Sequence, residues 1–405
     1  GRWLVYDGTR WVKDEQGLIH AIAKETIDRI WEEARESKQN DAHYKELVSF
    51  AQRSRSRAMR SNMIELAQTE PSVQITADEL DRNPHLLNFQ NGTLDLMTRE
   101  FRPHEMSDYL TKQCPFAYDE DAPVIPNRFR KFVDEVFGKD QSLVQYMRQV
   151  IGYSLTGLTV HQIFWMLYGS GANGKSVLTE TLLWMLGDYG GRTPSETLMH
   201  REMSNSVPND LARLQGLRLV VASELEEGRR WNESRIKDLT GGDRITARFL
   251  HREFFEFHSV LKLMVPTNHK PIVRGTDHGI QRRIKLVPFT VQIPPEKRDP
   301  KLKEKLCAEA SSITKYCIDM LPDFVAEYWE PDIISAATRE YFSENDIVGQ
   351  FLEESCDVAN SVLRTSKKEL YKHFEQHCED YGIRPFSQNK LSQLLKERSF
   401  EETKQ

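Results

Sequence analysis

The chain has 405 residues, a length that favours two or three domains because single hydrophobic cores rarely grow beyond about 250 residues. It is 39% hydrophobic and 29% charged, with no apolar run near the ~18 residues that would span a bilayer, which excludes a membrane-spanning helix. Its five cysteines have no C-x-x-C spacing, so we expect neither a disulfide framework nor a zinc site, and a reducing cytoplasm fits. No basic and apolar leader follows Gly1, so we expect part of a longer, non-secreted protein.

The net charge of −6 argues at first against a nucleic-acid-binding protein, but the charges are unevenly distributed. Residues 211–290 hold 15 Lys and Arg against nine Asp and Glu, an excess of six positive charges that leaves −12 on the remainder. A basic middle with acidic flanks suits a protein that holds an anionic polymer internally. Random scatter of surface charge is the alternative.

The first part of the chain reads as a small mixed α/β domain over residues 1–118. Residues 3–6 are strand-like, and residues 18–34 have the apolar spacing of a helix. Arg53, Arg55, Arg57 and Arg60 form a basic cluster that we interpret as a solvated helix surface. The acidic, proline-containing segment 119–126 predicts a domain boundary.

Beyond this boundary the pattern predicts an α/β core over residues 127–295. Apolar residues at spacings of three and four predict helices over 129–137 and 143–151. The continuous apolar runs 163–168, 217–222 and 261–265 are typical of strands buried on both faces of a parallel sheet. Strands that alternate with helices indicate a sheet covered on both sides. A mostly helical region over 301–405 follows, with helices expected at 301–328 and 367–398.

The segment directly after the first of these strands matches the phosphate-binding pattern G-x-x-x-x-G-K-[ST] in full. Its glycines allow backbone N–H groups to surround phosphates, and the helix expected over 177–186 points its positive end at them. Lys175 would contact the β and γ phosphates of ATP, and Ser176 would ligate Mg²⁺. The predicted nucleotide-binding residues are Gly169, Ser170, Gly171, Ala172, Asn173, Gly174, Lys175, Ser176 and Val177.

An acidic segment follows the second strand. A carboxylate at the carboxyl end of a strand beside the phosphate loop can hold Mg²⁺ through water and polarise the attacking water. Glu224 is the first choice for this catalytic and metal-binding role, and Glu226 is the alternate. Glu227 is assigned to surface charge, and an ordinary acidic loop is the competing interpretation.

Two further segments supply candidates for catalysis. Asn268 follows the third strand and could hydrogen-bond the γ-phosphate and the attacking water, although a turn-forming Asn before a proline is an equal alternative. Arg283, then Arg282, and more weakly Arg274, could reach the γ-phosphate of a neighbouring subunit, an arrangement worth roughly 10³ to 10⁵ in rate. An arginine supplied in this way requires an oligomer.

Taken in order, the motifs at 169–176, 222–228, 239–248, 266–271 and 282–284 resemble those of the phage and plasmid primase–helicase family, relatives of the poxvirus primase–helicase. The match is specific over residues 169–289 and looser over the N-terminal part, where Asn91-Gly92-Thr93-Leu94-Asp95 is similar to the family. The resemblance implies an AAA+-type superfamily 3 core, a hexameric ring, ATP hydrolysis and 3′ to 5′ travel on single-stranded DNA. A primase active site is not expected, because no catalytic carboxylate set for one is recognisable.

The segment 239–255 resembles the hairpin that the family points into the central channel. Alternating cations beside an aromatic side chain suit a strand whose tip contacts phosphates and stacks on bases. Arg248, His251 and Arg252 are the predicted DNA-binding residues, and an exposed hairpin with solvated charges is the alternative.

The segment 367–400 reads as helix, Gly382 turn and helix, and it resembles a winged-helix-like module. Lys390, Lys396 and Arg398 could meet a DNA backbone, and a protein-docking tail is an equal alternative.

We therefore expect an ATP- and Mg²⁺-dependent replicative DNA helicase that works as a homo-oligomeric ring on single-stranded and fork DNA. A primase or polymerase is a possible partner, and a phage or mobile element in the bacterial cytoplasm is the expected setting. The main alternative is a nucleotide-dependent DNA-binding switch, such as a replication initiator or loader that assembles without unwinding. A small-molecule kinase is the other alternative, but it should lack both the basic hairpin at 239–255 and an asparagine in the place of Asn268.

Overall fold

The computed structural model describes residues 3–37, 41–200, 209–250, 253–273, 278–358 and 363–403. The chain forms two compact units, Gly1–Glu120 and Asp121–Gln405. Each unit is described by itself below. The division falls within the acidic, proline-containing segment that follows the three-stranded sheet of the first unit.

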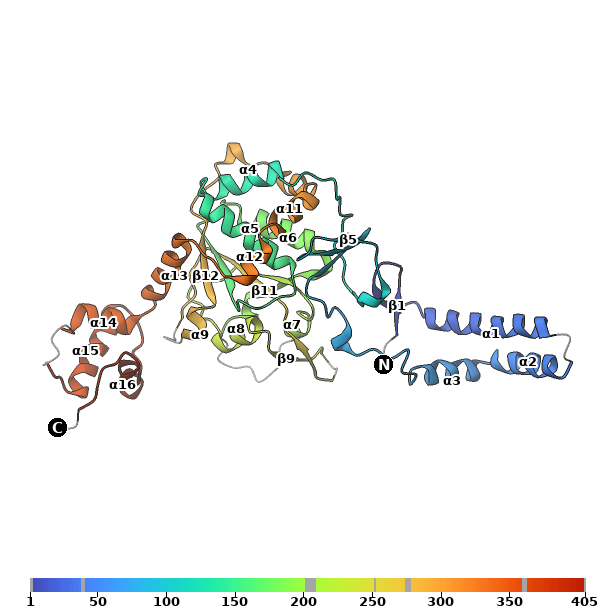
Figure 1. Cartoon of the computed structure of the whole chain (residues 1–405). Coiled ribbons are helices and arrows are strands. Elements are labelled where there is room, and N and C mark those ends of the chain that lie inside the picture. The colour runs from blue at the N-terminus through green and yellow to red at the C-terminus, as the bar shows by residue number, and fades with distance from the viewer. Residues whose placement is uncertain are drawn as a thin grey trace. The chain divides into compact units, whose positions relative to one another are not determined.

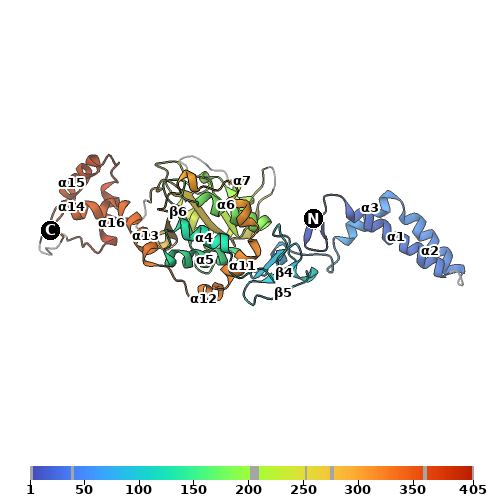
Figure 2. The same cartoon turned by 90° about the horizontal axis from the view of Figure 1, so that it is seen from above.

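The first unit combines a strand hairpin, a helical arm and a small sheet. In both views helix α1 runs alongside α2 and α3 (Figures 1 and 2), and only a thin stripe of residues such as Ala23, Ile27 and Ala51 is buried between them. The side-chain amide of Asn88 ties the hairpin to the sheet, because it donates to the carbonyls of Thr9 and Lys112. The elements are β1 (Leu4–Tyr6), β2 (Trp11–Lys13), α1 (Leu18–Glu36), α2 (Asp41–Ser54), α3 (Arg57–Ala67), β3 (Leu86–Phe89), β4 (Gly92–Asp95) and β5 (Phe101–Arg102).

A five-stranded sheet organises the second unit. All of its neighbouring strands pair in parallel, in the spatial order β12, β6, β11, β8, β7. Because carboxyl ends of parallel strands share one edge, the segments that follow β6, β8 and β11 are brought together. The strands are β6 (Phe164–Tyr168), β7 (Gly190–Thr193), β8 (Leu219–Ala222), β11 (Lys262–Thr267) and β12 (Ile284–Pro288).

Helices cover both faces of this sheet. Figure 1 shows α4, α5, α6 and α11 on one side and α7, α8 and α9 on the other. Successive strand residues alternate between the two layers, so that Phe164 and Met166 join the cluster that includes Ile236 of α8 and Ile280 of α9. The helices are α4 (Asn127–Val136), α5 (Gln141–Leu155), α6 (Lys175–Leu186), α7 (Asn209–Ala212), α8 (Glu233–Thr240), α9 (His278–Gln281), α10 (Leu302–Cys307), α11 (Ala310–Ile318), α12 (Leu321–Ala326) and α13 (Asp332–Glu344). A separate antiparallel hairpin consists of β9 (Arg244–Ala247) and β10 (Phe255–His258).

The last part of the chain is helical, with α14 (Ile347–Ser355), α15 (Lys367–Asp380) and α16 (Gln388–Glu397). These three helices enclose a small core of their own around Phe351, Phe374 and Leu391. Gly382 turns the chain between α15 and α16 at φ +66°, a conformation that a glycine adopts without strain. Strands are absent from the described residues after 301, so the helix–turn–helix part of the expected module is seen without a wing.

The expectation of a mixed α/β chain with a parallel sheet and a helical C-terminal region is confirmed. Each of the three apolar runs forms a strand of this sheet, as β6, β8 and β11. Over the described residues, every helix is too short or too polar to cross a lipid bilayer.

Candidate nucleotide site

The glycine-rich loop joins β6 to α6 and is shaped by close backbone approaches. A Cβ on Gly169 would lie 2.2 Å from the carbonyl oxygen of Phe289, and Gly171 and Gly174 have φ values of +95° and +85°. The segment after β12 makes two hydrogen bonds to the loop. Asn173 Nδ2 donates to the Phe289 carbonyl at 3.2 Å, and the Ile293 amide donates to the Ala172 carbonyl at 2.8 Å. The loop is therefore preformed, with glycine where other residues would clash or strain.

Lys175 is the first residue of α6 and is buried, with 6% of the residue exposed. Its ammonium group donates to the Gly169 carbonyl at 2.6 Å, to Asn173 Oδ1 at 3.1 Å and to Asn268 Oδ1 at 3.0 Å. Burial lowers the pKa of Lys175 below its usual value, and the nearby carboxylate of Glu224 acts in the opposite direction. The cation is thus held by neutral oxygens, a set of ligands that phosphate oxygens could replace.

Glu224 and Asn268 lie at the carboxyl ends of β8 and β11. The Asn268 amide nitrogen donates to Glu224 Oε1 while its oxygen accepts from Lys175. Because β11 is inserted between β6 and β8, Asn268 stands between the lysine and the carboxylate. The structure therefore brings together three residues that the sequence predicts from three separate motifs.

The other predicted residues of this region make no hydrogen bond to Lys175, Asn268 or Glu224 in the described part of the chain, apart from those of the glycine-rich loop. Ser176 is exposed in the first turn of α6, as a metal-ligating hydroxyl requires. Glu226 forms an ion pair with Arg229 at 2.8 Å and its side chain is 71% exposed, and it is not among the hydrogen-bond partners of Lys175 described above. Gln292, which sequence reasoning missed, donates from Nε2 to Ser170 Oγ at 2.9 Å.

Arg282 and Arg283 lie at the opposite edge of the sheet, before β12 begins. Arg283 is 7% exposed, and its guanidinium donates to Thr240 Oγ1, the Gly279 carbonyl and Gln162 Oε1 at 2.7 to 3.2 Å. Arg282 is exposed and makes a bond of 2.9 Å to Gln162 Oε1. Of the two, Arg282 is the one that a neighbouring molecule could reach. Arg274 lies outside the described residues.

The β9–β10 hairpin carries exposed aromatic and cationic side chains near its tip. The guanidinium of Arg248 lies 4.8 Å from the ring centroid of Phe254, and the rings of Phe249 and Phe255 stack at 5.7 Å. Leu250 is 70% exposed between them. The predicted tip residues His251 and Arg252 lie outside the described residues.

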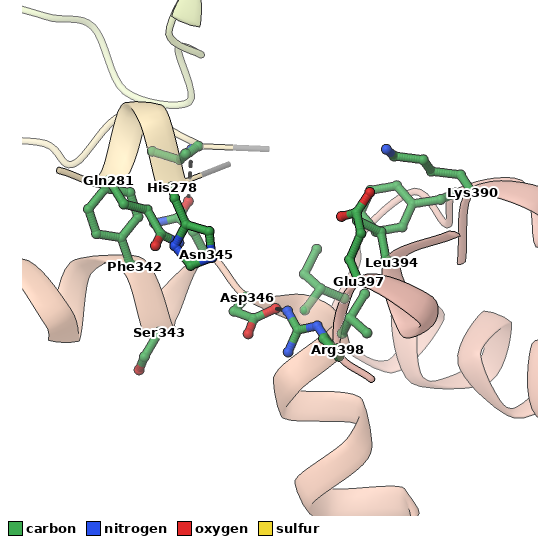
Figure 3. Close-up of a pocket in the computed structure, with 14 residues that line it drawn as sticks. His278, Gln281, Phe342, Ser343, Asn345, Asp346, Lys390, Leu394, Glu397 and Arg398 are labelled. Carbon is green, nitrogen blue, oxygen red and sulfur yellow. Dashed lines mark hydrogen bonds and ion pairs between the residues drawn. The ribbon is translucent and has the colours of Figure 1, made fainter. Parts of the chain in front are cut away.

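A cavity of about 900 Å³ lies elsewhere in the second unit, between α9, the end of α13 and the C-terminal helices (Figure 3). His278, Asn345 and Arg398 are among its lining residues, and the phosphate-binding loop is not. In the same view Asp346 faces Arg398, and the two side chains form an ion pair. Clusters of three or more His, Cys, Asp or Glu side chains with metal-binding geometry are absent from the described part of the chain.

Three protein-family models match the chain in succession. The model "D5 N terminal like" matches residues 1–138, a family of unknown function matches residues 167–283, and "Poxvirus D5 protein-like" matches residues 343–405. The resemblance to relatives of the poxvirus primase–helicase is confirmed.

Proteins similar in sequence to this chain come from large DNA viruses. A presumed helicase of Acanthamoeba polyphaga mimivirus is 33% identical over 214 residues, which are 52% of this chain and 22% of the relative. A presumed helicase of Invertebrate iridescent virus 3 is 25% identical, and the match covers 69% of this chain and 33% of the relative. A presumed primase of African swine fever virus is 24% identical, and the match covers 80% of this chain and 34% of the relative. The chain thus spans between about a fifth and a third of these relatives.

Among solved structures, the apo C-terminal region of NrS-1 is similar with a TM-score of 0.46 and 12% identity. The match covers 65% of this chain and 70% of that one.

Proposed function

We propose that the second unit is an ATP-hydrolysing AAA+-type core of a viral or mobile-element primase–helicase that drives DNA unwinding during replication. The observation that carries the proposal is the hydrogen-bonded series Lys175, Asn268, Glu224 at the carboxyl edge of a parallel sheet, next to the glycine-rich loop. The names of the viral relatives, which include helicases and primases, support a role in replication.

The residues fit a nucleoside triphosphate. The loop leaves open space above Gly171, where a Cβ would meet nothing within 4 Å, while Gly169 and Gly174 are closely packed. The α6 N-terminus and Lys175 would bind the phosphates, and Val177 follows in the first turn. Bound Mg²⁺, held by Ser176 and through water by Glu224, would neutralise phosphate charge, which is the chemistry this ion supplies in such sites.

Hydrolysis would then depend on three roles. Glu224 polarises the attacking water, and Asn268 hydrogen-bonds the γ-phosphate once ATP has displaced it from Lys175. Arg282 approaches from the neighbouring subunit of a homo-oligomeric ring, with a hexamer as the expected size. We place Arg282 ahead of Arg283 because Arg283 is buried and bonded within its own subunit.

The β9–β10 hairpin would contact single-stranded DNA at a fork. Arg248 supplies a cation, Phe249 and Phe254 supply rings for stacking, and His251 and Arg252 complete the proposed tip. A primase or polymerase acting on the same fork is the proposed partner.

The test is ATP turnover with and without single-stranded DNA, together with strand displacement on a fork. Lys175→Ala should abolish turnover, and Glu224→Gln should lower kcat by about 10² to 10⁴ while ATP and DNA still bind. Glu227→Gln, an exposed carboxylate of the same loop, is the matched control and should behave as wild type. Turnover by Lys175→Ala would refute the proposal, and ATP and DNA binding without strand displacement would favour the binding switch instead.

A further inference from the structure

The loops that carry Glu224 and Asn268 are joined to each other behind the site. The Ile272 amide donates to the Arg229 carbonyl at 2.8 Å, and the Trp231 amide donates to the Ile272 carbonyl at 3.2 Å. These bonds form a short bridge between the segment after β8 and the segment after β11. A shift of one loop is therefore transmitted to the other.

A single phenol of α13 clamps this bridge. Tyr341 is fully buried, and its hydroxyl donates to the Pro271 carbonyl at 2.5 Å and accepts from the Trp231 indole N–H at 2.9 Å. One oxygen atom thus bonds both loops at once. A buried indole N–H or carbonyl that loses its partner costs about 1 to 3 kcal/mol, so the clamp specifies one relative placement of the two loops.

The last turn of α13 holds the Asn268 loop at two further points. Lys270 Nζ forms an ion pair with Glu344 at 2.7 Å, and the same nitrogen lies 5.3 Å from the ring centroid of Tyr168, the residue before Gly169. The Val273 amide donates to Asn345 Oδ1 at 3.2 Å. The segment 270–273 is therefore fixed to α13 along its length.

We infer that Tyr341, assisted by the Lys270–Glu344 pair, positions Asn268 and Glu224 relative to each other for hydrolysis. The inference rests on the proposed function. Tyr341 touches neither Lys175 nor the glycine-rich loop in the contacts of the described residues, so its loss should leave nucleotide binding intact. It should slow the chemical step, because misplacement of a catalytic group by about 1 Å can cost about 10²-fold in rate.

The chain offers a matched control for Tyr341→Phe. Tyr146 is also a fully buried phenol that accepts a hydrogen bond of 2.9 Å from a buried indole, that of Trp165, and its hydroxyl is 2.8 Å from that of Tyr328. It lies on α5 and contacts neither of the two loops through its hydroxyl. Tyr146→Phe therefore removes the same chemical group at comparable structural cost, away from Asn268 and Glu224.

A second pair of variants changes ion pairs instead of fully buried phenols. Glu344→Gln weakens the ion pair with Lys270, and Glu330→Gln weakens a pair with Lys285 that forms at the same 2.7 Å and also places its lysine over a tyrosine ring. The side chain of Glu330 is 20% exposed against 45% for Glu344, and it also accepts from Tyr328 and Ser335, so Glu330→Gln is the more disruptive of the two substitutions and a stringent control. Lys285 projects from β12 and takes no part in the Asn268 loop.

The experiment measures kcat, the KM for ATP, the Kd of a non-hydrolysable ATP analogue and the melting temperature of all four variants. Tyr341→Phe should lower kcat about 10- to 100-fold with the analogue Kd within about twofold of wild type, and Glu344→Gln should lower kcat less. Tyr146→Phe and Glu330→Gln should keep the wild-type kcat, even where the melting temperature falls as far as in Tyr341→Phe.

Equal kcat values in Tyr341→Phe and Tyr146→Phe would overturn the inference, and so would a loss of analogue binding that matches the loss of kcat. If Tyr341→Phe does not fold, the comparison of Glu344→Gln with Glu330→Gln decides, and equal kcat values there overturn it. Absence of ATP turnover in the wild-type chain would instead contradict the proposed function itself. Failure of the proposed function can therefore be told apart from failure of the inference about Tyr341.

Discussion

The ammonium group of Lys175 is held by three oxygens of its own chain, and one of them belongs to Asn268. Asn268 uses its other amide atom on Glu224. An asparagine suits this place because it carries an acceptor for the cation and a donor for the carboxylate. A bound γ-phosphate would take the lysine and release the asparagine oxygen, so the same three side chains can report whether the phosphate is present.

The pKa of Lys175 gives a prediction at this scale. Phosphate binding needs the protonated amine, and burial lowers its pKa, so nucleotide affinity should fall as pH rises and should begin to fall below the usual lysine value of about 10.4. Glu224 raises this pKa, so Glu224→Gln should move the loss of affinity to lower pH. The measurement is the Kd of an ATP analogue from about pH 7 to about pH 10. Identical alkaline midpoints in wild type and Glu224→Gln would contradict it.

The sequence was informative about these residues for a definite reason. Lys175, Glu224 and Asn268 each follow a continuous apolar run. A buried strand that is followed by a polar residue can be predicted from the sequence alone. The burial of Arg283 could not be predicted from the sequence, because its hydrogen-bond partners Gln162, Thr240 and Gly279 come from other parts of the chain. Tyr341 carried no signal either, because its partner Trp231 is 110 residues away in the chain.

At the scale of elements, the sequence predicted the strands that are buried on both faces of the sheet, because each of them is a continuous run of apolar residues. Strand β7 has the sequence Gly-Gly-Arg-Thr, which contains no apolar run, and it was not expected. It forms because the edge of the sheet beside β8 offers hydrogen bonds to a segment with little side-chain bulk. Strand order was equally inaccessible, because periodicity shows that a strand is buried but not which strands are its neighbours.

The β9–β10 hairpin yields a prediction that separates DNA contact from surface charge. Arg248→Ala should weaken single-stranded DNA binding and reduce the salt dependence of log Kd by about 0.7, the contribution of one phosphate contact. Arg244→Ala is the matched control, because Arg244 lies on the same hairpin but is paired with Glu256 at 3.7 Å. The measurement is a fluorescence titration at several salt concentrations. The same salt slope in Arg248→Ala and wild type would remove Arg248 from the DNA interface.

At the scale of the whole molecule, the position of Arg282 limits how the site could be completed. Arg282 precedes β12, and Lys175 follows β6, which is the parallel neighbour of β12. The five residues of β12 separate the two edges of the sheet by about 16 Å at 3.3 Å per residue. Arg282 is therefore remote from the phosphate loop of its own chain, and it could act only on the loop of another copy.

This separation makes subunit mixing the decisive measurement for the ring. Lys175→Ala and Arg282→Ala should each be inactive alone, but a mixed oligomer pairs the intact loop of one variant with the intact arginine of the other. Random mixing in equal amounts should restore activity at roughly a quarter of the interfaces. Glu227→Gln in place of Arg282→Ala is the control, since Glu227 is exposed and that variant should be active by itself, so mixing should only dilute its activity. A mixture as inactive as its two components, or full wild-type turnover in a monomer, would show that Arg282 does not serve a neighbouring site.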